Sequence, residues 1–304
     1  MTSIKYYFLL GLFKLIGVLP LRLLYLVSDV CYLLLFYVIQ YRRRVILQNL
    51  AIAFPDQSVS FYHNTAKAST RHLCDLFIEM IKSMQMSKKA FEKRFVVENI
   101  EAINNYAEQQ QSVVLLLGHY ASYEWIFAVQ LKAKFKGYAV YKPLRNKAFN
   151  RLIVKIRSKL GAILVPMVET VKTVISSQQK NEVAMYTFIA DQSPKKNKIN
   201  YFSSFFEKPT AAFTGYESLA QKFDIPVFYL QVQKLRRGYY SCKLVPVSEQ
   251  LKSEEKYAVV DRFFQQLEAQ IAADPRYYLW SHKRWKFSPE DIGDKAILST
   301  AFQR

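Results

Sequence analysis

The first 40 residues are dominated by apolar side chains. Residues 23–40 form an apolar stretch of roughly 18 residues, which as a helix extends about 27 Å and nearly crosses a bilayer core. The basic block at residues 41–44 follows, and such a block marks the cytoplasmic end of an apolar helix. We predict an N-terminal membrane anchor over residues 1–44, either a spanning helix or two helices lying in the interface and bent at Pro20. A signal peptide is disfavoured because no small-residue cleavage site follows the apolar region. A buried helical hairpin is the remaining alternative.

After the N-terminal segment, the spacing of apolar residues changes near residue 93. Helical spacing of apolar residues up to that point gives way to short apolar runs that alternate with amphipathic stretches. The predicted strands are residues 113–117, 137–141, 163–165, 183–190 and 227–232, with an antiparallel addition near 239–247. The predicted helices in this part are residues 125–135, 149–160 and 257–273. This alternation predicts one α/β domain over residues 45–304, with a central mixed sheet flanked by helices.

Composition and charge narrow the choice of partner. The 304 residues are 51% hydrophobic and carry a net charge of +19, which indicates an anionic partner. No nucleic-acid-binding motif is present, so a nucleic-acid binder would rest on charge alone and we predict none. An anionic membrane agrees better with the apolar N-terminus. The three cysteines are widely spaced and predict neither a disulfide framework nor a zinc site, and we expect no metal and no cofactor.

His119 stands where α/β proteins place functional side chains. It follows the apolar run VVLLL and Gly118 and precedes a predicted helix. Glu124 lies five positions later, about 140° away on a regular helix, so the two side chains can meet only if His119 is in the loop and Glu124 in the first turn. A carboxylate bonded to one imidazole nitrogen leaves the other as a proton acceptor.

This arrangement suits general-base catalysis. We predict that His119, oriented by Glu124, removes a proton from an acceptor hydroxyl as the hydroxyl attacks a thioester. The absence of a G-x-S-x-G motif favours direct transfer without an acyl-enzyme. A structural histidine in the turn is the alternative from these residues alone.

Five segments carry a resemblance to a known family. They are GHYASYEW at 118–125, YKPLRNKAFNRLI at 141–153, IADQSP at 189–194, FFEKPTAAFTG at 205–215 and WSHKRWKF at 280–287. In this order they resemble the bacterial lipid A biosynthesis acyltransferases, the lauroyl and myristoyl transferases of lipopolysaccharide assembly. Ala121 and Ser122 stand where many members carry Gly-Asn, and Glu207 replaces a glycine.

The resemblance implies a substrate pair and a location. It implies a glycerolipid-acyltransferase-like fold, an acyl donor carried by acyl carrier protein, and a phosphorylated glucosamine-based lipid acceptor. It also implies the bacterial inner membrane, with the catalytic domain on the cytoplasmic side. Two alternatives remain: an acyltransferase for a lysophospholipid, an amino-acid lipid or a pigment alcohol, or a catalytically inactive membrane-bound lipid-binding protein.

The resemblance also implies residue roles. His119 and Glu124 match the catalytic pair of the family. Arg157 and Asp191 match residues that we assign to phosphate or oxyanion contact and to site organisation, because a guanidinium stabilises negative charge and Asp191 follows an apolar strand. Lys195 and Lys196 crowd the next loop, where they could bind an acidic carrier protein or lipid phosphates.

Overall fold

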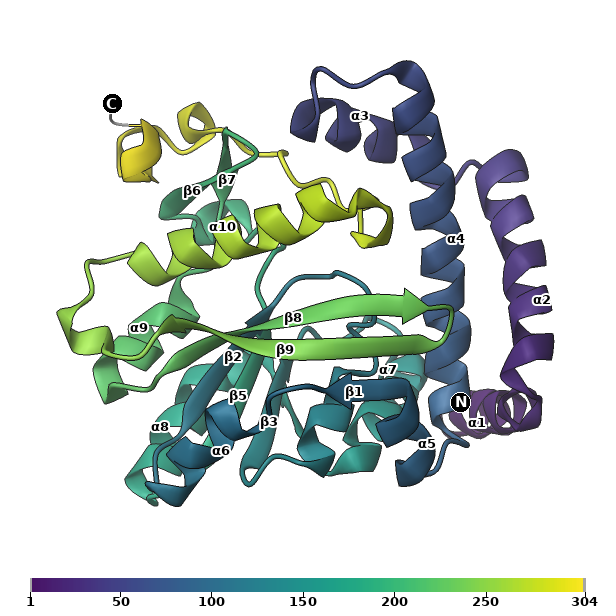
Figure 1. Ribbon diagram of the computed structural model, residues 1–304, viewed down its shortest axis with the longest axis horizontal. Coiled ribbons are helices and arrows are strands. Elements are labelled where there is room, and N and C mark those ends of the chain that lie inside the picture. Colours follow the sequence, from purple (N-terminus) through teal and green to yellow (C-terminus); the bar gives the residue numbers. More distant parts are fainter. Residues whose placement is uncertain (1, 303–304) are drawn as a thin grey trace.

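The computed structural model describes residues 2–302, and its centre is a seven-stranded sheet (Figure 1). The strands are β1 (Phe95–Val97), β2 (Val113–Leu117), β3 (Lys136–Tyr141), β4 (Ile163–Pro166), β5 (Ala184–Ile189), β6 (Tyr201–Phe205), β7 (Lys208–Ala211), β8 (Val227–Arg236), β9 (Tyr239–Ser248) and β10 (Ile297–Leu298). The helices are α1 (Thr2–Val18), α2 (Leu21–Leu33), α3 (Arg43–Ala53), α4 (Val59–Ser83), α5 (Lys88–Arg94), α6 (Glu101–Glu108), α7 (Lys147–Arg157), α8 (Thr170–Gln179), α9 (Gly215–Phe223) and α10 (Ala258–Ala273).

Strand β2 occupies the middle of the large sheet. The strand order is β1-β9-β8-β2-β5-β3-β4, and β2 pairs in parallel with both β5 and β8. All five residues of β2 are buried, as expected of an apolar strand that is covered on both faces. Strand β9 runs antiparallel to β8, which confirms the predicted mixed sheet and its antiparallel addition. Because β2 and β5 are parallel, the residues that follow them emerge at the same edge.

Helices and a second sheet complete the layers around the large sheet. Helix α10 packs against β8 and β9 and crosses above them in Figure 1. A three-stranded sheet of order β10-β6-β7 lies beyond α10, and β6 packs on that helix. The sequence pattern did not predict this smaller sheet, since its strands are short and carry several polar residues.

One predicted helix is much shorter than expected. Residues 125–135 were predicted to be helical, but the structure has only a 3-10 segment, η2 (Ile126–Leu131). Residues 132–135 then lead into β3, whose first residue, Lys136, donates its backbone N–H to the carbonyl of Val183.

Two N-terminal helices lie along one side of the molecule. They meet at Pro20, and α2 continues into a π-helical segment, η1 (Leu34–Val38). By length and composition alone, residues 21–38 form the one helix among residues 2–302 that could cross a membrane. Helix α2 packs along α4, and α1 packs against α4 and α7, as Figure 1 shows on its right-hand side. The division at residue 44 between anchor and catalytic domain stays a prediction.

A buried acidic residue lies where α4 meets α2 and β9. Glu79 is fully buried and accepts hydrogen bonds from the hydroxyls of Tyr25, at 2.7 Å, and Tyr240, at 2.9 Å. Burial disfavours its charged form and raises the pKa of Glu79 to about 7, although these hydrogen bonds partly oppose the shift. The group therefore binds its proton more tightly in the folded chain than in the unfolded chain.

This shift predicts a pH-dependent stability. Between pH 4.5 and 7 the folded state holds a proton that unfolded Glu79 releases, so stability falls as pH rises through this window. The contribution is on the order of 3 kcal/mol. We expect Glu79→Gln, which carries no charge at any pH, to flatten the decline of thermal stability between pH 5 and pH 8. Glu108→Gln, on the surface, should leave the slope unchanged; an unchanged slope in Glu79→Gln would contradict the prediction.

Candidate active site

His119 sits in a turn held by the backbone of residues 277–279. The carbonyl of His119 accepts from the N–H of Leu279 at 3.0 Å, and the N–H of Ala121 donates to the carbonyl of Tyr277 at 3.0 Å. Ala121 has a φ of 47°, in the left-handed region that turns the chain sharply. Gly118 fits just before the turn because a Cβ there would lie 2.5 Å from the side chain of Leu267. The sequence thus places His119 at the carboxyl end of β2, as predicted.

The carboxylate partner of His119 is Asp191. The Nδ1 atom of His119 lies 2.6 Å from Oδ1 of Asp191, which is 2% exposed. Burial by itself would raise the pKa of this carboxyl, but the charge and hydrogen bonding of His119 outweigh it and lower the pKa of Asp191 to about 2. The ionised carboxylate can only accept, so Nδ1 carries the proton.

The second imidazole nitrogen faces an amide. The Nε2 atom of His119 lies 3.3 Å from Nε2 of Gln192. With Nδ1 protonated, a neutral imidazole offers a lone pair at Nε2, and the amide N–H of Gln192 donates to it. The His119 side chain is 17% exposed, so an incoming hydroxyl can reach this nitrogen. Gln192 was not predicted, although it is the third residue of the IADQSP segment.

Glu124 pairs with Arg157 instead of His119. The Arg157 Nη2 and Nε atoms donate to the two Glu124 oxygens at 2.5 and 3.1 Å. Among the described residues Glu124 makes no hydrogen bond to His119, so the predicted orientation of the imidazole by Glu124 is wrong. The turn at Ala121 directs Glu124 toward the end of α7, while the parallel β5 brings Asp191 beside His119.

The pair of Glu124 and Arg157 is well shielded. Their side chains are 9% and 22% exposed. Burial alone would lower the pKa of Arg157, but the adjacent Glu124 carboxylate raises it above its ordinary value. The guanidinium is therefore charged at every working pH. Its Nη1 atom makes no hydrogen bond within residues 2–302, which leaves it available to an anionic or polarised oxygen.

Residues of the C-terminal WSHKRWKF segment bind the backbone around Asp191. Arg284 is 2% exposed and donates through Nη1 to the Asp191 carbonyl at 2.5 Å and through Nη2 to the Ala211 carbonyl at 2.7 Å. His282 accepts from the backbone N–H of Ser193 at 3.4 Å, and burial lowers its pKa to about 4, so its imidazole is neutral near pH 7. Both side chains hold the loop after β5.

Two further polar side chains lie at the turn of His119 and were not predicted from the sequence. The ring of Tyr123 contacts the His119 ring edge-on, with centroids 5.0 Å apart, and its hydroxyl has no hydrogen-bond partner in residues 2–302. His72, on α4, lies with Nε2 3.2 Å from the carbonyl of Ala121 and so supports the turn. No motif at His72 distinguishes it, since its role depends on packing between α4 and the turn.

The predicted lysines lie outside this core. Lys195 and Lys196 begin an exposed loop, and Lys196 makes only a long ion pair of 3.9 Å with Asp291. Their role in substrate binding stays a prediction. Within the described residues no group of histidine, cysteine, aspartate and glutamate side chains could hold a metal ion.

The fold and the site define a class of enzyme. A histidine backed by a buried carboxylate, with a guanidinium nearby, is suited to activating a hydroxyl for acyl transfer. The sequence pattern of the bacterial lipid A biosynthesis acyltransferase family matches residues 1–287, and the chain belongs to that family. It is therefore an acyltransferase of lipid A biosynthesis in the general sense. A search of curated proteins finds no match.

Proposed function

We propose that this enzyme moves a fatty acyl chain from an acyl carrier protein thioester to a hydroxyl of a lipid A precursor, with His119 as the general base. The observation that carries the proposal is the 2.6 Å bond between His119 Nδ1 and the buried Asp191. That bond leaves Nε2 as the proton acceptor, at the edge of the sheet where the site residues gather.

The proposed reaction needs one base and one donor to the oxyanion. The acceptor hydroxyl takes the place of Gln192 at Nε2 of His119, gives up its proton there and attacks the thioester carbon. The tetrahedral intermediate carries a negative oxygen, which Arg157 stabilises through its unbonded Nη1. The carbon–sulfur bond then breaks, and the leaving thiolate takes the proton from the imidazolium. Glu124 holds the guanidinium in position.

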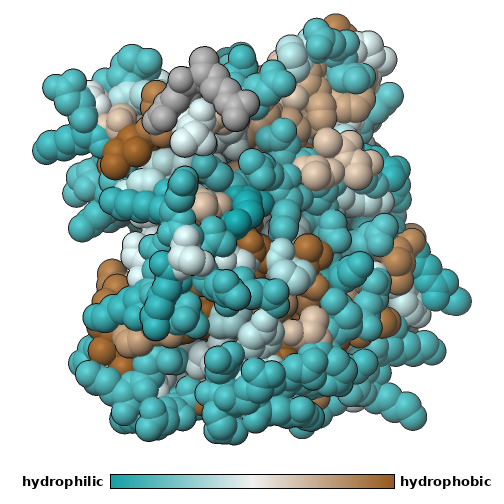
Figure 2. Space-filling model, turned by 60° about the vertical axis from the view of Figure 1, so that its left-hand side comes forward, coloured by the Kyte–Doolittle hydropathy of each residue, from teal (hydrophilic) through white to brown (hydrophobic). Residues whose placement is uncertain are grey.

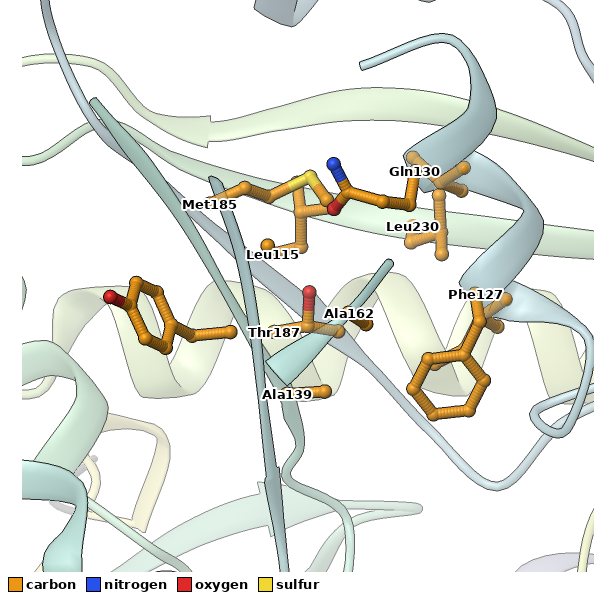
Figure 3. Close-up of a pocket in the computed structure, with 12 residues that line it drawn as sticks. Leu115, Phe127, Gln130, Ala139, Ala162, Met185, Thr187 and Leu230 are labelled. Atoms are coloured by element: carbon orange, nitrogen blue, oxygen red, sulfur yellow. The ribbon is translucent and has the colours of Figure 1, made fainter. Parts of the chain in front are cut away.

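A small apolar cavity lies among the segments that carry the site. Figure 3 shows it between the strands and η2, with Leu115, Phe127 and Met185 among its walls. Its volume is about 20 Å³, which is room for one water molecule and much less than a fatty acyl chain occupies. Leu115 lies four residues before His119 on β2, and η2 begins two residues after Glu124, so the segments that line the cavity also carry the site. In this conformation the cavity does not admit the acyl chain.

The charge of the chain and its family support the proposed donor and location. Lys195 and Lys196 would contact an acidic carrier protein or the phosphates of the acceptor, and the net charge of +19 suits an anionic membrane. We place the catalytic domain on the cytoplasmic side of the bacterial inner membrane, where the acyl carrier protein is found.

Lipid analysis of cells that lack the gene tests this function. We expect mass spectrometry to show lipid A without one acyl chain, restored by the unchanged gene and not by His119→Ala. Purified protein should transfer the same chain from acyl carrier protein to the isolated precursor. Intact lipid A together with a missing acyl chain on another lipid would contradict the proposed acceptor and favour a lysophospholipid, amino-acid lipid or pigment alcohol.

A further inference from the structure

The outward faces of the N-terminal helices α1 and α2 are apolar. On α2 and η1, exposed apolar residues recur every three or four positions. They are Leu23, Leu26, Val27, Val30, Leu33, Leu34, Tyr37 and Val38. Helix α1 shows a similar set, which comprises Ile4, Tyr7, Phe8, Leu12, Leu15 and Val18. This spacing places each set on one face of its helix, and the opposite faces pack on the protein.

The inner face of α2 packs Leu21, Leu24 and Tyr25 into the core, and polar residues beside them tie the helix to the catalytic domain. Ser28 donates to Asp75 of α4 at 2.7 Å, and Asp29 accepts from Arg71 of α4 at 2.9 Å. Arg237, at the turn between β8 and β9, binds Asp29 at 2.8 Å and Asp75 at 2.6 Å. Helix α2 is therefore held against two other elements by buried or half-buried charges.

These charges conflict with a transmembrane position. Asp29 lies at the midpoint of residues 21–38, so a spanning α2 would put it at the centre of the bilayer. It would draw Arg71, Arg237 and Asp75 to the same depth, together with the flank of α4. Charged groups at that depth are strongly disfavoured. With α2 lying in the interface, its apolar outer face meets the hydrocarbon while Asp29 and its partners stay at the side of the protein.

The charge of the N-terminal segment identifies the surface that it contacts. Residues 1–44 contain six basic residues and one acidic residue, Asp29, which is already paired. Anionic headgroups attract such a segment. The face in Figure 2, turned toward the side opposite α2, is mainly hydrophilic, with apolar residues in separate small patches. In Figure 1, α1 and α2 lie together on one side of the molecule.

We propose that α1 and α2 lie flat in one leaflet of an anionic bilayer, with their outer apolar faces in the hydrocarbon, and that neither helix crosses the membrane. The inference goes beyond the proposed acyl transfer and does not depend on it. It requires the N-terminus, the bend at Pro20 and the catalytic domain to lie on the same side.

Thiol labelling of the full chain tests this topology. In a background without the three native cysteines, Ile4→Cys and Leu19→Cys should not react with a membrane-impermeant maleimide added outside spheroplasts. Glu108→Cys, in the catalytic domain, serves as the control for lysis and for labelling after permeabilisation. Any crossing by α1, by α2 or by both would expose position 4 or position 19. Labelling of either from outside would therefore overturn the proposal.

Binding to phosphatidylglycerol vesicles tests the contact surface. We expect Leu26→Glu and Val30→Glu to weaken vesicle binding of the purified chain about tenfold or more, because each removes an exposed apolar side chain that would enter the hydrocarbon and adds a negative charge. Ile297→Glu, at an exposed apolar residue of the small sheet, should bind as before. Unchanged binding by both helix variants would overturn the proposal. His119→Ala should bind vesicles normally even though it loses activity, which separates this inference from the proposed chemistry.

Discussion

Replacing His119 by alanine should lower the rate of acyl transfer by about 10²–10⁴-fold, the range that general-base catalysis typically supplies. The imidazole is the group whose Nε2 accepts the proton when the acceptor hydroxyl takes the place of Gln192, and its position is fixed through Nδ1 by Asp191. The side chain is only partly buried, so its removal should leave the fold intact. The measurement is kcat with saturating acyl carrier protein thioester and acceptor lipid.

A second histidine provides the control for this variant. His63 lies on α4, away from the turn, so His63→Ala should retain full activity. Equal melting temperatures of the two variants would show that the loss is chemical. Near-normal kcat in His119→Ala would contradict the proposed base and, with it, the mechanism.

Asp191→Asn should have the second-largest effect, with a loss in kcat approaching that of His119→Ala. The carboxylate holds the proton at Nδ1 and stabilises the imidazolium that forms when Nε2 takes the hydroxyl proton. An asparagine can present its N–H₂ group to Nδ1 and so favour the tautomer that carries its proton on Nε2, which cannot act as a base. Loss of a carboxylate behind a catalytic histidine can cost about 10⁴ in kcat. The KM for the acyl donor should change little.

The rates of two variants distinguish the two carboxylates of the site. The pKa of Asp191 is lowered to about 2, so this group is ionised near neutral pH. Asp191→Asn removes the charge beside His119 and should therefore lower kcat more than Glu124→Gln does. Glu124→Gln should lower the rate only by disturbing Arg157. A larger loss of kcat in Glu124→Gln than in Asp191→Asn would restore Glu124 as the partner of His119.

Much of this protein could be predicted from local patterns. The apolar run of β2 and the glycine after it located His119 at the carboxyl end of a buried strand, because strand burial and turn formation depend on neighbouring residues. The antiparallel β9 and helix α10 were predicted for the same reason. The regular helix expected at residues 125–135 was wrong: residues 126–131 form a 3-10 segment, which the spacing of apolar residues did not indicate.

The partner of His119 could be decided only by tertiary structure. Glu124 is five residues away in sequence and Asp191 is 72, yet the parallel pairing of β2 and β5 brings the second to 2.6 Å and the turn at Ala121 sends the first to Arg157. The same holds for α2: its sequence alone allows a spanning helix, and its contacts with Arg71, Asp75 and Arg237 oppose one. Hydrophobic spacing determines which segments become strands and helices, whereas the pairing of charges depends on which segments the sheet and the helical layer place side by side.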